Sequence, residues 1–101
     1  MVKILLVCSA GMSTSLMVNK MKDSAAKKGL DAEIWAVADA EAGNNISKAD
    51  ILMLGPQVRF LESKMKTLAG SKPVTVIDMQ AYGQMNGEKV LEQALKLLGI
   101  E

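Results

Sequence analysis

The single cysteine of the chain, Cys8, ends an apolar run and opens the segment CSAGMSTS at residues 8–15, which is rich in small and hydroxyl side chains. A cysteine that only fills space would not need these neighbours, whereas a thiol that holds an anion would. If a strand ends at Cys8 and a helix begins soon after it, backbone N–H groups and the helix N-terminus would form an anion cradle. The same field favours a thiolate. The pattern therefore indicates phosphate-handling chemistry at Cys8.

The residues after Cys8 suit such a cradle. The small side chains of Ser9, Ala10 and Gly11 would let the backbone approach an anion closely. The hydroxyls of the following segment could cap a helix and donate to phosphoryl oxygens, and its members are Ser13, Thr14 and Ser15. A purely structural interpretation also fits, because cysteine is often a small buried residue and Ser or Thr is often only a helix cap.

The composition excludes several other kinds of chemistry. With one cysteine and no histidine, the chain cannot build an internal disulfide, a multi-cysteine zinc site, a Cys-His dyad or a Ser-His-Asp triad. It cannot itself carry phosphohistidine, and we expect no metal and no cofactor. Any nucleophilic chemistry must therefore belong to Cys8.

Charge and hydropathy limit the partners. The formal net charge of +1 argues against nucleic-acid binding. The apolar runs, such as ILLVC at residues 4–8, are far shorter than the roughly 20 residues of a membrane helix, and polar loop chemistry rather than a cleavage site follows that run. We expect a cytoplasmic protein without membrane insertion, built as one domain over residues 1–101.

Apolar runs and helical periodicity alternate along the chain. The predicted strands cover residues 3–7, 32–37, 51–54 and 74–78. Three amphipathic helices are predicted, with the apolar faces Met17, Val18, Met21 and Ala25; Val58, Leu61, Met65 and Leu68; and Val90, Leu91, Ala94, Leu95 and Leu98. Glycines at 29, 70 and 99 end them.

Two segments are less regular in this prediction. Residues 38–49 are expected to form a short helix or an irregular connection, and residues 81–87, AYGQMNG, a loop. The aromatic side chains of Trp35 and Phe60 are expected to pack in the core or at a sheet edge. The whole pattern predicts an α/β fold with a four-stranded parallel sheet and helices on both faces.

Ligands of such folds bind at the carboxyl ends of the strands. Cys8, Gln57, Asp78 and Tyr82 all follow predicted strands, so we expect them at one rim. Gln57 and Tyr82 are candidates for ordering the loop or shaping a docking surface, although Gln57 could simply start a helix and Tyr82 could simply pack over the loop. Asp78 fits a turn or helix cap, and we do not assign it as an acid because a carboxylate would repel a phosphocysteine.

The low-molecular-weight tyrosine phosphatases use a similar strand, loop and helix with the pattern C-x5-R followed by Ser or Thr. Here Thr14 occupies the arginine position, so the guanidinium clamp that stabilises a transferring phosphoryl group is missing. The single arginine, Arg59, lies elsewhere and is interpreted as a surface residue, with a contact to the rim or to a partner left open. Slow hydrolysis is what a phosphate carrier needs.

Three stretches of the chain resemble one known family, the enzyme IIB components of the lactose and cellobiose/chitobiose branch of the bacterial phosphoenolpyruvate-dependent sugar phosphotransferase system. The stretches are VCSAGMSTSLMVNKM at 7–21, ADILMLGPQVRFLE at 49–62 and KPVTVIDMQAYGQMNGEKVL at 72–91. The resemblance implies a single domain with sheet order 2-1-3-4, similar to the low-molecular-weight tyrosine phosphatases.

The resemblance also implies a phosphorelay. Cys8 would accept a phosphoryl group from a phosphohistidine on enzyme IIA and pass it to a sugar bound by the membrane enzyme IIC, at the inner face of the membrane. Residues 9–15 would form the phosphate loop, with Gln57 and Tyr82 beside it. Met12 is a candidate for an apolar contact with the partner proteins, and packing over the first helix is the alternative. Cellobiose, chitobiose and other β-glucosides or β-galactosides are candidate sugars, and a monomer is the simplest expectation.

Two other functions stay open from the sequence. A phosphatase-like cysteine hydrolase would turn over a small aryl phosphate, and a noncatalytic anion-sensing module would bind phosphate reversibly without a covalent bond.

Overall fold

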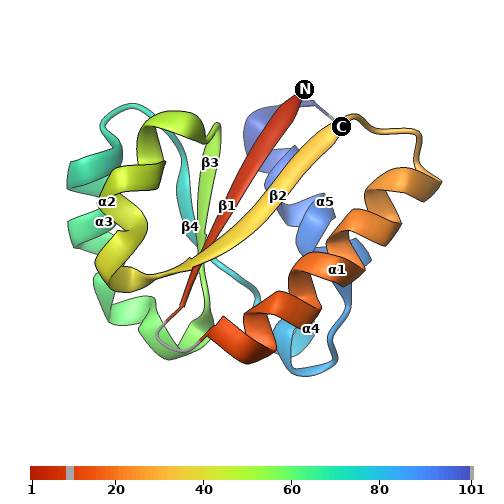
Figure 1. Cartoon of the computed structure of the whole chain (residues 1–101), viewed down its shortest axis with the longest axis horizontal. Coiled ribbons are helices and arrows are strands. Elements are labelled where there is room, and N and C mark those ends of the chain that lie inside the picture. The colour runs from red at the N-terminus through yellow and green to blue at the C-terminus, as the bar shows by residue number, and fades with distance from the viewer. Residues whose placement is uncertain (9–10, 101) are drawn as a thin grey trace.

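Four parallel strands form the sheet at the centre of the molecule (Figure 1). The structure, a computed structural model, describes residues 1–8 and 11–100, with residues 11–14 described by their backbone alone. The strands are β1 (Val2–Cys8), β2 (Ala32–Ala38), β3 (Ile51–Leu54) and β4 (Val74–Val76). Their order, β2-β1-β3-β4, confirms the predicted α/β fold and the predicted strand order.

The central strand β1 is buried on both faces because its side chains alternate between two cores. Ile4 and Leu6 enter the core on one face, and Leu5 and Val7 enter the core on the other. An unbroken apolar run is the pattern expected of a parallel strand that is covered on both sides. β1 therefore contributes to the cores on both faces of the sheet, and it ends at Cys8.

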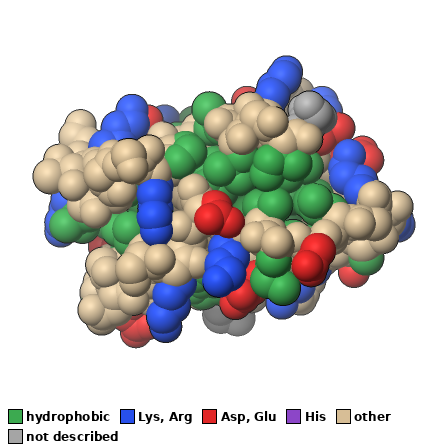
Figure 2. Space-filling view, turned by 90° about the horizontal axis from the view of Figure 1, so that it is seen from above, with side chains coloured by type: hydrophobic (Ala, Val, Ile, Leu, Met, Phe, Trp, Pro, Cys, Tyr) green, Lys and Arg blue, Asp and Glu red, His purple; other side chains and the backbone are tan. Residues whose placement is uncertain are grey.

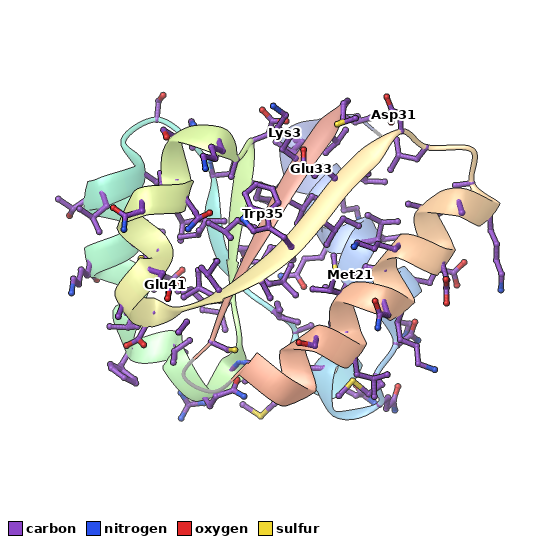
Figure 3. The ribbon with its side chains drawn as sticks, in the orientation of Figure 1. Lys3, Met21, Asp31, Glu33, Trp35 and Glu41 are labelled. Atoms are coloured by element: carbon purple, nitrogen blue, oxygen red, sulfur yellow. The ribbon has the colours of Figure 1, made fainter. Side chains whose placement is uncertain are left out.

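One face of the sheet is covered by α1 (Gly11–Lys27), α4 (Met79–Gly83) and α5 (Gly87–Leu98) (Figure 1). Apolar side chains of all three helices join the core on this face, and Met21 of α1 points toward the sheet (Figure 3). α1 and α5 approach closely at Gly87, where a Cβ would lie 2.5 Å from the carbonyl carbon of Lys20. Only a glycine fits at this contact.

Shorter segments cover the opposite face (Figure 1). They are η1 (Asp39–Glu41), α2 (Ala42–Asn45), η2 (Ile46–Lys48), η3 (Pro56–Leu61) and α3 (Glu62–Ala69). Trp35 lies on the α2 side of β2 (Figure 3), and its indole N–H donates to Asn45 Oδ1 at 3.1 Å. The ammonium of Lys72 donates to the carbonyls of Ile46 and Ser47 at 2.9 and 3.1 Å. Residues 39–48 thus form short helical turns, in agreement with the short helix or irregular connection predicted for residues 38–49.

The prediction for residues 74–87 is partly wrong. β4 ends at Val76, and residues 79–83 form α4 instead of a loop. Asp78 explains the change, because its carboxylate accepts a hydrogen bond from the N–H of Ala81 at 2.9 Å and so caps the helix. Gly87 lies at the start of α5 and does not belong to a loop either.

Two apolar residues predicted to be buried in the third quarter of the chain are exposed. Phe60 is 75% exposed and Leu68 is 51% exposed. The predicted helix begins as a 3-10 segment with non-helical backbone at Val58. Val58, Leu61 and Met65 nevertheless pack in one core as predicted, and only Leu68 of the predicted apolar face is exposed, with Ala69 buried in its place. Within α3 the buried side chains are Met65 and Ala69, four residues apart.

The two ends of the sheet differ. Backbone hydrogen bonds and one carboxylate fasten the end where the strands begin: Asp50 N–H donates to the Lys3 carbonyl at 2.8 Å, and Lys3 N–H donates to Asp50 Oδ2 at 2.8 Å. Both termini of the chain lie at this end (Figure 1), and apolar side chains gather on it (Figure 2). The carboxyl ends of the strands face the other way, with Cys8 among them.

Candidate phosphate site

Cys8 is the last residue of β1, and its side chain is 0% exposed. It pairs with Ala38, the last residue of β2. The preceding carbonyl, that of Val7, accepts a hydrogen bond from Gly55 N–H at 2.9 Å, which brings the end of β3 beside the end of β1. The thiol therefore lies at the centre of the carboxyl end of the sheet.

The helix α1 begins at Gly11, three residues after Cys8. Its 17 residues make it the longest helix among the residues that the structure describes, and its N-terminus lies at the end of the sheet that carries Cys8 (Figure 1). A helix N-terminus has unpaired N–H groups and a partial positive charge of about half a unit, which favour a bound anion. This arrangement suits a cysteine that carries a phosphoryl group.

The predicted phosphate loop lies partly outside the described residues. Ser9 and Ala10 fall there, as do the side chains of Met12, Ser13 and Thr14. Because α1 begins at Gly11, the hydroxyl residues 13–15 lie inside its first turns and do not precede it, so the prediction that they cap the helix is wrong. Ser15 is exposed on α1.

Gly55 lies between Cys8 and Gln57. A Cβ at Gly55 would be 3.6 Å from Cys8 Cβ and would collide with Gln57 Oε1, so the Gln57 side chain folds back over this glycine. Gly55 is buried and has φ −61°, so its backbone angles do not require glycine, and the missing side chain leaves room for the Gln57 carboxamide. Gly55 directly follows the strand predicted at residues 51–54, but no pattern in the sequence indicated its place beside Cys8.

Gln57 and Tyr82 meet at the rim. The Nε2 group of Gln57 donates to the hydroxyl of Tyr82 at 3.3 Å. Gln57 comes from η3 after β3, and Tyr82 comes from α4 after β4. The structure thus brings together two of the residues that the sequence placed at one rim, beside Gly55 and Cys8.

Asp78, which was also expected at the rim, and Arg59, which was expected at the surface, lie at positions that agree with structural roles. Asp78 is the N-cap residue of α4, one of the two positions that the sequence allowed for it. Arg59 lies in η3 and its side chain is exposed, in agreement with a surface residue. Among the described residues, no three acidic or cysteine side chains lie together as a metal site would require.

These features define a class of small α/β proteins with a cysteine at the carboxyl end of the first parallel strand, directly before a long helix. A family model described as "PTS system, Lactose/Cellobiose specific IIB subunit" matches residues 3–93. The chain therefore belongs to the lactose/cellobiose-specific IIB family of the sugar phosphotransferase system, as its sequence motifs indicated.

Curated relatives agree with this assignment. The chain is 51% identical over 100 residues, 97% of each chain, to the oligo-beta-mannoside-specific EIIB component of Bacillus subtilis (strain 168). It is 46% identical over 102 residues, 94% of each chain, to two components of Lactococcus lactis. These are the galactose-specific EIIB component of subsp. cremoris (strain MG1363) and the cellobiose-specific EIIB component of subsp. lactis (strain IL1403).

Solved structures agree as well. The cellobiose-specific IIB component of Borrelia burgdorferi is 37% identical, with a TM-score of 0.77 over 94% of this chain and 89% of that one. The lactose-specific IIB domain of Streptococcus pneumoniae, 21% identical, shares the fold with a TM-score of 0.81 over 94% of this chain and 95% of that one.

A YwlE variant from Bacillus subtilis, which has the low-molecular-weight tyrosine phosphatase fold, is 18% identical with a TM-score of 0.63 over 98% of this chain and 99% of that one. This similarity confirms the predicted likeness of fold and says nothing of activity. IIB components act as phosphotransferases in the sugar phosphotransferase system, together with IIA and IIC components. No helix in the described part of the chain is long and apolar enough to span a membrane.

Proposed function

We propose that Cys8 is the phosphoryl carrier of this IIB domain, which we take to extend over residues 1–101. One observation carries the proposal: the single thiol of the chain ends β1 directly ahead of the N-terminus of α1, inside the stretch that matches the family. The chain contains no histidine, so a phosphohistidine donor must lie on another protein, and we assign that role to enzyme IIA.

The phosphoryl group is transferred in two steps. In the first, the sulfur of Cys8 attacks the phosphorus of the partner's phosphohistidine; an S–P bond forms, the N–P bond breaks, and the imidazole leaves with the thiol proton. In the second, a sugar hydroxyl oxygen attacks the same phosphorus; a P–O bond forms, the S–P bond breaks, and the thiol is regenerated with the hydroxyl proton. Backbone N–H groups of residues 9–15 hold the phosphoryl oxygens in the intermediate.

The intermediate has to survive until the acceptor arrives. A hydrolase of this fold would need a guanidinium on the phosphoryl group, but Thr14 stands at that sequence position, and the single arginine lies exposed in η3. Slow attack by water is therefore a property of the proposed carrier. This difference favours a carrier over a phosphatase-like hydrolase.

The acceptor in this proposal is a β-linked sugar bound by the membrane enzyme IIC. We place the domain in the cytoplasm, where it contacts the membrane only through IIC, and we propose that it is a monomer. Three curated relatives are specific for oligo-β-mannosides, galactose and cellobiose. We propose cellobiose, chitobiose or another β-glucoside or β-galactoside for this chain. A panel of these sugars and mannobiose, supplied with IIC in vesicles, would identify the sugar by the phosphosugar released.

The decisive test is the intact-protein mass after incubation with phosphoenolpyruvate and the general relay proteins, with and without enzyme IIA. We expect a gain of one phosphoryl group that requires IIA and is absent in Cys8→Ser. A matched control combines Cys8→Ser with Ser71→Cys, which keeps one thiol but places it on an exposed residue; it should also stay unmodified.

No mass gain in the wild type with an active relay would overturn the carrier proposal. A hydrolysis assay with a small aryl phosphate would then decide between a hydrolase and an anion-binding module.

A further inference from the structure

The outer edge of β4 is covered by one side chain of α5. Within the described part of the chain, β4 pairs only with β3. Beside the other edge of β4, Gln93 Nε2 donates to the Val76 carbonyl at 2.8 Å. The Oε1 atom of the same side chain accepts from Asp78 N–H at 3.0 Å. The Val76 carbonyl and the Asp78 N–H lie on either side of Ile77. In a parallel sheet, one residue of a neighbouring strand would form hydrogen bonds with both of these groups. The carboxamide of Gln93 thus takes the place of a fifth strand at this point.

Hydrogen bonds fix the orientation of the Gln93 carboxamide. Gln93 Nε2 also donates to Thr75 Oγ1 at 3.2 Å, so both its donor and its acceptor atoms bond to the chain around β4. Gln93 is half-buried. A glutamine with both ends of its amide engaged has one favourable orientation. The chain after β4 is therefore fixed where it turns toward α4.

That turn sets the place of α4. Asp78 caps the helix through Ala81 N–H at 2.9 Å, and the Asp78 carbonyl accepts from Tyr82 N–H at 2.9 Å. α4 has five residues, and a helix of this length does not hold its own position without anchors. Ala81, which is buried, and Tyr82, which packs against the core, anchor it to the sheet. At its start it is held by Asp78, whose own N–H bonds to Gln93.

From α4 the contacts lead to the cysteine. The Tyr82 hydroxyl accepts from Gln57 Nε2 at 3.3 Å. Gln57 Oε1 lies against Gly55, and Gly55 lies against Cys8. A shift of the β4–α4 junction would therefore move Tyr82 and Gln57 relative to the thiol.

We propose that Gln93 is a positioning residue for phosphoryl transfer at Cys8. Its amide fixes the β4–α4 junction and, through Tyr82, the arrangement of the rim. This inference rests on the proposed function of Cys8 as the phosphoryl carrier.

The test is a double-variant cycle on the rate of phosphoryl transfer from phosphorylated enzyme IIA to the protein. Gln93→Met keeps the side-chain length but removes the donor and acceptor, and we expect transfer to slow by about tenfold, the scale on which small misplacements act. In a Tyr82→Phe background the same change should slow transfer by less than about twofold, because the two residues act through one path.

The control is Lys72→Met, which removes two hydrogen bonds from a side chain to backbone carbonyls in the layer of α2 and η2, whereas Gln93→Met removes three hydrogen bonds, two of them to backbone groups. The melting temperature of Lys72→Met should fall as it does for Gln93→Met, while its transfer rate stays at the wild-type value. Equal transfer rates for Gln93→Met and Lys72→Met, or independent effects of Gln93→Met and Tyr82→Phe, would overturn the inference.

A second variant covers the case in which Gln93→Met does not fold. Gln93→Glu keeps an acceptor for Asp78 N–H and regains a donor when its carboxyl is protonated. Its transfer rate relative to the wild type should therefore rise as the pH falls from about 8 to about 5, toward the ordinary pKa of glutamate; a constant ratio would contradict the inference. A wild type that takes no phosphate would instead overturn the proposed function and this inference with it.

Discussion

The two helical layers cover the same sheet by different means. On one face, α1 and α5 are long helices whose apolar side chains interlock with the strands, and their backbones meet at Gly87 and Lys20. On the other face, short helical turns between residues 39 and 61 leave carbonyl groups that side chains must satisfy, as Lys72 does for η2. The first layer depends mainly on apolar packing, and the second depends more on individual polar contacts.

The candidate site lies where the two layers meet at the carboxyl end of the sheet. Tyr82 comes from the α1, α4 and α5 layer, and Gln57 comes from the layer of short segments. One exposed hydrogen bond joins them. Substitutions far from the thiol can therefore destabilise either layer separately. The variants described next compare how much stability a similar substitution removes in each layer.

The largest difference between the layers is expected for a glycine-to-alanine change, made at Gly87 in the layer of long helices and at Gly43 in the other layer. The new Cβ of Gly87→Ala would lie 2.5 to 2.8 Å from backbone atoms of Lys20, so α1 and α5 must separate, at a cost of about 3 kcal/mol in the free energy of unfolding. Urea unfolding followed by circular dichroism would measure it.

The matched control for that variant is Gly43→Ala in α2, where a Cβ would meet nothing within 4 Å. It should leave stability unchanged or raise it by up to about 1 kcal/mol, because alanine favours a helix over glycine. Equal losses in the free energy of unfolding for the two variants would contradict the prediction that the close contact between α1 and α5 requires a glycine.

The next effect compares one methionine from each core. Met21→Ala leaves a cavity between α1 and the sheet, and Met65→Ala leaves one under α3. Both side chains are buried, but the short segments around Met65 can relax into the space more easily than two long packed helices. We expect losses of about 4 kcal/mol for Met21→Ala and about 2 kcal/mol for Met65→Ala. A larger loss for Met65→Ala, measured by the same unfolding experiment, would contradict this difference between the layers.

The same contrast explains how far the fold could be predicted. The apolar faces of α1 and α5 repeat at helical spacing, so their buried residues were predicted correctly from Met17 to Ala25 and from Val90 to Leu95. In the other layer the pattern holds for Val58, Leu61 and Met65, which share one core. It fails at Leu68, because the non-helical backbone at Val58 in η3 shifts the helical phase before α3 begins. Phe60 was also predicted to pack in the core or at a sheet edge and is exposed.

The site was predictable only in part, for a related reason. Cys8, Gln57 and Tyr82 could be placed at one rim because parallel strands bring their carboxyl ends together. The roles of Gly55 and Gln93 depend on contacts between residues far apart in the chain, such as Gln93 with Asp78. Local patterns in the sequence do not carry that information.

A smaller effect is expected for Trp35→Phe. The change removes the indole donor to Asn45 Oδ1 but keeps an aromatic ring on β2, so the loss should be about 1 kcal/mol. In an Asn45→Ala background, which removes the acceptor, the same change should cost clearly less. Independent losses in this thermodynamic cycle would mean that the hydrogen bond does not hold α2 to β2.

The smallest effect on stability is expected for Tyr82→Phe, which removes the hydrogen bond between the layers. Because the bond to Gln57 is exposed and 3.3 Å long, we expect a loss of about 0.5 kcal/mol. Phosphoryl transfer to Cys8 should nevertheless slow severalfold, because Gln57 loses its partner beside Gly55. A rate measurement from phosphorylated IIA, set against Trp35→Phe as the control, separates the two properties: Trp35→Phe should lose more stability and keep its transfer rate. If Trp35→Phe slowed transfer as much as Tyr82→Phe, the rate would follow general stability, and the contact between the layers at the rim would have no separate part in the transfer.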